Sequence, residues 1–191
     1  MSKSSLQQFC DLVSTVSLNN AIVFQESFAN LFEENEKYDR TYVIKSFAFM
    51  NYTFAVGVWS NLRNEQLRRD LIIQLKLTLI LQLGNYFAPT LEGDEFAATC
   101  ALLNEEFDLY LVEFKEGMKL YSEHHAGTSR IFAMERIQQR YRISDAIMDN
   151  VSWQMFSDGT TSEVETVAMQ VNDALEERDG KGFFRRLFGL N

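Results

Sequence analysis

Proline occurs once in the 191 residues, at position 89. Because proline removes a backbone N–H donor and clashes with the preceding helical turn, long helices need stretches of chain that lack it. Most of the glycines lie in polar stretches where a helix would end. Gly57 instead lies in an apolar run, where the missing side chain would let another helix approach closely. The scarcity of proline therefore predicts an all-α fold built from long helices.

Apolar residues recur at the helical period in the N-terminal part of the chain, over residues 6–31. Residues 42–59 are apolar nearly all round. A helix without a polar side is typical of a position inside a protein, because each of its faces has to be removed from water. We therefore expect residues 42–59 to form the central helix of a bundle.

Residues 75–83 read LKLTLILQL, an alternation that a half-buried strand would also show. The leucine-rich composition favours a helix, since strands are enriched in β-branched residues. In that helix a row of polar residues at four-residue spacing would share one narrow face. This row, which we expect to face solvent, comprises Gln66, Asp70, Gln74, Thr78 and Gln82.

The clearest amphipathic pattern covers residues 96–121, with Asp94 as the expected N-cap of that helix. A further helix is predicted to follow Thr128 and to end at Gly159. A capping box that starts at Ser162 would then open the last helix. No internal repeat and no low-complexity segment interrupts this pattern.

The predicted fold is a single-domain, all-α bundle of about six helices over residues 1–178. A short basic and apolar C-terminal segment, residues 179–191, follows the bundle. The whole chain has a net charge of −9, and the last twelve residues contain three basic residues and no acid, so the rest carries −12. Such an acidic body repels phosphate backbones, so we expect no nucleic-acid partner.

Cys10 and Cys100 are the two cysteines, far apart in the sequence and without CxxC spacing. They are predicted to be free thiols packed as small apolar groups. The first residues lack an apolar stretch of signal-peptide length, and no run of about 20 apolar residues is suited to span a bilayer. We therefore expect a cytoplasmic protein.

Signatures of catalysis are missing from the sequence. It contains no phosphate-binding loop and no nucleophile elbow, and its two histidines, His124 and His125, are adjacent and cannot complete a zinc site of usual spacing. We expect no metal, no cofactor and no enzymatic activity. Two acidic pairs have a spacing at which a helix face could share a divalent cation, so a metal-dependent hydrolase or a small-ligand-binding bundle stays open as the alternative. These pairs are Glu33 with Glu36 and Glu105 with Asp108.

The C-terminal segment carries the most unusual pattern in the chain. One helical turn would gather its apolar side chains on one side and leave its arginines on the other, but a segment this short needs something to fold against. We expect that surface to belong to a protein partner, with the protein's own body or a membrane surface as alternatives. The predicted contact residues are Phe183, Phe184, Arg185, Arg186, Leu187 and Phe188.

A second candidate contact is the basic pair Arg136 and Arg140. The two residues are four apart, so they share one helix face and repel each other, and an acidic partner would relieve that repulsion. The sequence therefore favours a non-enzymatic protein-binding role, of an adaptor or regulatory kind. Its oligomeric state is not specified by any of these patterns.

Overall fold

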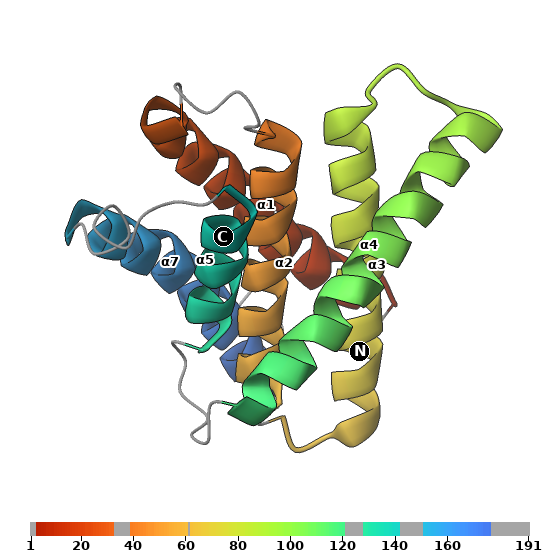
Figure 1. Cartoon of the computed structure of the whole chain (residues 1–191). Coiled ribbons are helices and arrows are strands. Elements are labelled where there is room, and N and C mark those ends of the chain that lie inside the picture. The colour runs from red at the N-terminus through yellow and green to blue at the C-terminus, as the bar shows by residue number, and fades with distance from the viewer. Residues whose placement is uncertain (1–2, 33–38, 61, 121–127, 142–150, 177–191) are drawn as a thin grey trace, which may run out of the picture.

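The computed structural model describes residues 3–32, 39–60, 62–120, 128–141 and 151–176. Within these ranges the chain is helical, without a strand, which confirms the all-α bundle. Figure 1 shows α2 in the middle of the molecule, with α5 and α7 on its left and α3 and α4 on its right. The helices are α1 (Lys3–Phe32), α2 (Arg40–Trp59), α3 (Glu65–Phe87), α4 (Gly93–Leu120), α5 (Thr128–Tyr141) and α7 (Val151–Glu176). In the described ranges, no helix is long and apolar enough to cross a membrane.

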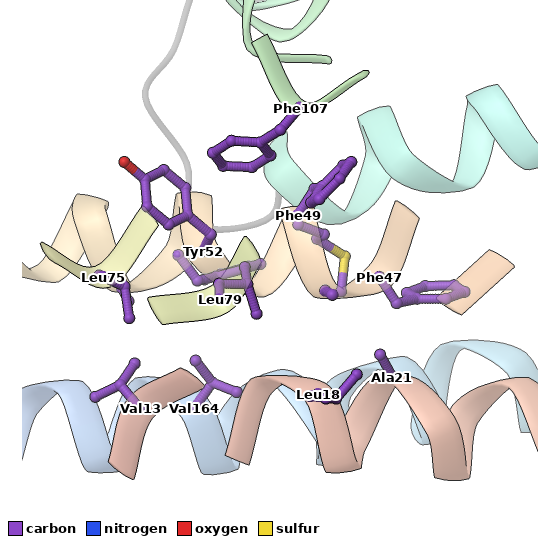
Figure 2. Close-up of a cluster of buried hydrophobic side chains, with 14 of the residues drawn as sticks. Val13, Leu18, Ala21, Phe47, Phe49, Tyr52, Leu75, Leu79, Phe107 and Val164 are labelled. Carbon is purple, nitrogen blue, oxygen red and sulfur yellow. The ribbon is translucent and has the colours of Figure 1, made fainter. Parts of the chain in front are cut away.

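The helix α2 is enclosed, as the sequence predicts. Every residue from Ser46 to Ala55 is buried. Since successive residues of a helix point about 100° apart, ten consecutive buried positions require neighbours on all sides. On one side Phe49 and Tyr52 point toward Phe107 of α4, and on the other side lie α1 and α7 (Figure 2).

The two ends of α2 are fixed by polar contacts. At the N-terminus the carboxylate of Asp39 accepts a hydrogen bond from the Tyr42 amide, at 3.2 Å, and caps the helix. At the C-terminus the indole Nε1 of Trp59 donates to the backbone oxygen of Ala168 in α7, at 3.1 Å. Trp59 is completely buried, so this hydrogen bond satisfies a donor that water cannot reach.

Small side chains line the buried face of α1, which packs against α2 and α3. Cys10, Ser14, Ser17 and Ala21 are almost completely removed from solvent on α1. A hydrogen bond also joins α1 to α2: the Asn51 Nδ2 of α2 donates to the backbone oxygen of Ser17, at 3.0 Å. A buried amide is costly unless it is hydrogen-bonded, so this contact favours one register of the two helices over the alternatives.

The residues from 65 to 87 form the helix α3 and not a strand, as expected, but the predicted solvent-facing row is wrong in its second half. Thr78 is buried and accepts a hydrogen bond from Gln7 Nε2 of α1, at 3.3 Å. Gln82 Nε2 donates to the Thr15 hydroxyl of α1, at 3.0 Å. Because α1 presents polar groups of its own, the second half of this row packs against α1, whereas Gln66 and Asp70 face solvent as predicted.

The glycine that allows close helix packing is Gly84, and not Gly57 as predicted. A Cβ atom at Gly84 would lie 2.8 Å from Cys100 Sγ and 3.1 Å from a ring carbon of Phe96, both on α4. At Gly57, which is exposed, none of the described atoms lies within 4 Å of such a Cβ. The absent side chain of Gly84 therefore sets how closely α4 approaches α3.

Three predicted helix boundaries also differ. The helix α4 begins at Gly93, whose φ is +56°, so Asp94 lies in the first turn and not at the N-cap. The helix after Thr128 ends at Tyr141. The helix α7 runs through both Gly159 and Ser162, because one glycine in a helix costs only about 1 kcal/mol and the apolar stripe of α7 is buried. That buried stripe includes Val164, Ala168 and Val171.

The two glycines give opposite predictions for the same substitution. Gly57→Ala should raise the free energy of unfolding by about 1 kcal/mol, since alanine is the better helix former and meets no neighbour. Gly84→Ala should lower it by about 1–3 kcal/mol, since the new methyl group overlaps with Cys100 and Phe96. Urea unfolding followed by circular dichroism measures both. Equal effects of the two substitutions would contradict the α3–α4 packing.

Candidate functional site

The helix α3 is apolar on two opposite sides. Residues two positions apart in the sequence point about 200° apart on a helix, so the alternating leucines of residues 75–83 point in nearly opposite directions. The inner row is buried, and consists of Leu71, Leu75, Leu79 and Leu83. The outer row is between 48% and 59% exposed, and consists of Ile73, Leu77 and Leu81.

The helix α4 carries a second exposed apolar row. Leu102, Leu109 and Val112 are between 53% and 64% exposed. Their spacing of seven and then three residues keeps them on one face of the helix, and that face also carries the exposed Glu105 and Glu116. The face is thus aliphatic with acidic residues between and beside the apolar ones.

The ion pair between Lys76 of α3 and Asp108 of α4, at 2.6 Å, marks the line along which the two helices meet. In an antiparallel pair, the residues that follow such a contact on each helix turn to the same side, and those that precede it turn to the other. Leu75 and Phe107 precede the ion pair and are buried, whereas Leu77 and Leu109 follow it and are exposed. Both exposed rows therefore lie on one side of the α3–α4 pair, opposite the core.

We call this surface the α3–α4 outer face. It consists of Ile73, Leu77, Leu81, Leu102, Leu109 and Val112. The acids on the flanks of α4 are already neutralised by cations of neighbouring helices, as in the pairs of Glu106 with Lys45 and of Glu113 with Arg136. Among the described residues, neither Glu105 nor Glu116 forms an ion pair. The outer face therefore suits a ligand that is both apolar and basic.

Arg136 and Arg140 lie one turn apart on α5, as predicted, but they contact different parts of the chain. Arg136 is ion-paired with Glu113 of α4 and lies over the ring of Tyr110, 5.2 Å from its centroid. Arg140 lies 4.0 Å from the centroid of the Tyr42 ring, with the Asp39 carboxylate at 3.9 Å. Intramolecular acids thus relieve the repulsion that an acidic partner was expected to relieve. A role of the two arginines in partner binding stays a prediction.

The other residues singled out in the sequence divide into two groups. The six predicted tail residues, Phe183–Phe188, lie outside the described part of the chain, as do His124, His125 and the pair Glu33 and Glu36. Glu105 and Asp108 are described. Asp108 is ion-paired with Lys76 and also accepts a hydrogen bond from Asn104 Nδ2, at 3.1 Å. In the described ranges, no three His, Cys, Asp or Glu side chains come together to hold a metal ion.

Both cysteines are free thiols, as expected. The Cys10 Sγ is buried and lies 3.6 Å from the backbone oxygen of Leu71, to which it donates a weak hydrogen bond. Burial raises the pKa of the Cys10 thiol to about 12, and the negative charge of Asp11 adds to the effect. Burial also raises the pKa of Cys100. Since the thiolate is the nucleophile, neither environment activates a cysteine for catalysis.

No known protein-family model, curated protein or solved structure matches this chain. Its function therefore has to be inferred from its own surface. The α3–α4 outer face was missed in the sequence, although the alternation of residues 75–83 was the signal for it. If that segment is a helix, the alternation places apolar side chains on two opposite sides of it. A core that packs against one side leaves the apolar side chains of the other side exposed.

The raised pKa of Cys10 predicts a loss of stability at alkaline pH. The folded-state pKa of about 12 lies above the ordinary value of 9.0, so the unfolded chain releases this proton first as the pH rises through 9. The free energy of unfolding should thus fall by about 1 kcal/mol between pH 8 and pH 10 through this group alone. Urea titrations at the two pH values should show a smaller decrease for Cys10→Ala. An equal decrease in wild type and variant would refute the assignment.

Proposed function

We propose that this chain is a non-enzymatic protein-binding module, of an adaptor or regulatory kind, that acts in the cytoplasm. The observation that carries the proposal is the α3–α4 outer face, where six large aliphatic side chains are about half exposed or more. Soluble monomers seldom expose contiguous apolar patches of more than a few hundred Å², and larger ones mark interaction sites. Because the fold does not use this face, a partner can bind it without unfolding any helix.

The chemistry of the face indicates the kind of partner. Parallel rows of aliphatic side chains on two packed helices suit an amphipathic segment that lays its own apolar side on them. Glu105 and Glu116 would attract basic residues at the edges of that segment. We therefore propose a partner that presents an apolar and basic helix.

The residues predicted from the sequence keep a place in this proposal. The tail, Phe183–Phe188, remains a candidate contact with a partner. Of the two arginines on α5, Arg140 is the more exposed, at 49% against 23% for Arg136, and is the better candidate for a contact at the rim. A tail that attaches to a membrane surface is the alternative, and its test is capture of the full chain by anionic vesicles.

A hydrolase or small-ligand-binding role has less support. The Asp108 carboxylate, which would have to bind the cation, is neutralised by Lys76, and the Cys10 thiol is held in its protonated form by burial. A metal-dependent hydrolase would need this carboxylate free to bind the cation, and a hydrolase with a cysteine nucleophile would need the thiolate. The aromatic side chains of α2 that could have lined a ligand pocket, among them Phe47 and Phe49, are packed in the core.

The test is affinity capture of partners from native lysate by the full chain. The double variant Leu77→Glu with Leu109→Glu should reduce recovery of a specific partner about tenfold or more, because a buried charge costs more than the roughly 1.4 kcal/mol of a tenfold loss. Val23→Glu with Met169→Glu is the matched control. It changes two equally exposed apolar residues on α1 and α7 and should leave recovery unchanged.

Two outcomes would contradict the proposal. One is a partner that both double variants retain equally, since the outer face would then take no part in binding. The other is a full-length chain that captures no partner but turns over a nucleotide or an ester. In either case circular dichroism has to show that the variants are folded, as expected for substitutions at exposed positions.

A further inference from the structure

The α3–α4 outer face and the C-terminal segment of the same chain carry opposite charges. The 28 residues of α4 include seven acids and two lysines, for a net charge of −5. Residues 180–191 carry three basic residues and no acid. Two segments of opposite charge attract each other, and the attraction is strongest where neither is already neutralised. Glu105 and Glu116 are the acids of the outer face that stay unneutralised among the described residues.

The apolar patterns of the two segments also match. On α3 the outer row has a spacing of four residues, from Ile73 to Leu77 to Leu81. The tail has the same spacing in Phe183 with Leu187 and in Phe184 with Phe188. On a helix each such pair spans about 6 Å, so one helical turn of the tail would present apolar side chains at the same spacing as the aliphatic row. The arginines between them would then point toward the acidic flank.

The helix α7 ends on the side of the molecule where α3 begins. Figure 1 shows α7 running toward the end of α2 from which the chain continues into α3. The hydrogen bond from Trp59 to Ala168 fixes α7 at that end of α2. From Glu176, where α7 ends, to Phe183 the chain can span up to about 25 Å when extended. Ile73 lies about 12 Å along α3 from its first residue, Glu65.

A second copy of the chain is a less suitable occupant. Two copies that pair through the same face form an isologous contact, in which the same patch of each copy lies against that of the other. Glu105 and Glu116 of both copies would then be brought together in a chain of net charge −9. Like charges at an interface are destabilising. The basic tail is therefore a better occupant of this face than the same face of a second copy.

We propose that the C-terminal segment, Lys181–Phe188, docks on the α3–α4 outer face of its own chain and covers it when no partner is bound. The proposal rests on the proposed function, to which it adds a regulation. A partner segment that is apolar and basic has to displace the tail before it can bind. Competition of this kind lowers the apparent affinity of weak ligands and keeps an aliphatic surface away from non-specific contacts.

The test uses photo-crosslinking in the full chain, with the photoreactive p-benzoylphenylalanine in place of Phe188. Crosslinks should form within the monomer and map to residues 73–81 and 102–112. Leu77→Glu with Leu109→Glu should reduce their yield about tenfold, and Arg185→Glu with Arg186→Glu should reduce it as well. The control Val23→Glu with Met169→Glu should leave the yield unchanged, since Val23 and Met169 lie on other helices.

Crosslinks that map to other helices, or that appear only in a dimeric product, would overturn the proposal. A yield that is insensitive to both outer-face substitutions would do the same. These failures are distinct from failure of the proposed function. If the tail does not crosslink to the outer face while the Leu77→Glu and Leu109→Glu variant still loses its captured partner, the binding function stands and only its regulation by the tail is refuted.

Discussion

Burial of α2 on all of its sides is the constraint on which the other described helices depend. A helix with an unbroken buried run from Ser46 to Ala55 is stable only inside a shell, and α1, α3, α5 and α7 all contact it. The helix α4 completes the shell through Phe107. The centroid of the Phe107 ring lies 4.5 Å from that of Phe49 and 4.8 Å from that of Tyr52. Lys45 and Lys76, paired with Glu106 and Asp108 of α4, flank this aromatic contact.

The same constraint explains why one apolar row remains outside. The helix α3 contributes its inner leucines to the shell around α2 and its polar row to α1, through Thr78 and Gln82. These two contacts and the contact with α4 occupy all but one side of α3. The remaining side carries Ile73, Leu77 and Leu81, and the adjoining side of α4 carries Leu109 and Val112. These side chains are about half exposed and therefore contribute less to the fold than the inner row, and we propose a binding role for them.

Much of the fold could be predicted from the sequence because it depends on patterns within one segment. The central position of residues 42–59 and the helix over residues 75–83 are of this kind. What could not be predicted depends on a second segment. In the polar row of α3, Thr78 and Gln82 contact Gln7 and Thr15 of α1, and the importance of Gly84 depends on Cys100. For the candidate site the same holds. The spacing of Arg136 and Arg140 could be predicted, but the acids that neutralise them lie on other elements.

The central claim is that the inner apolar row of α3 stabilises the fold by packing in the core, whereas the outer apolar row contributes little to the free energy of unfolding. Two substitutions of the same residue type, two positions apart, test it most directly through the free energy of unfolding in urea. Leu75→Ala, in the inner row, should cost about 2–5 kcal/mol, whereas Leu77→Ala, in the outer row, should cost less than about 1 kcal/mol. Equal losses at the two positions would show that the outer row is part of the core and would contradict the account.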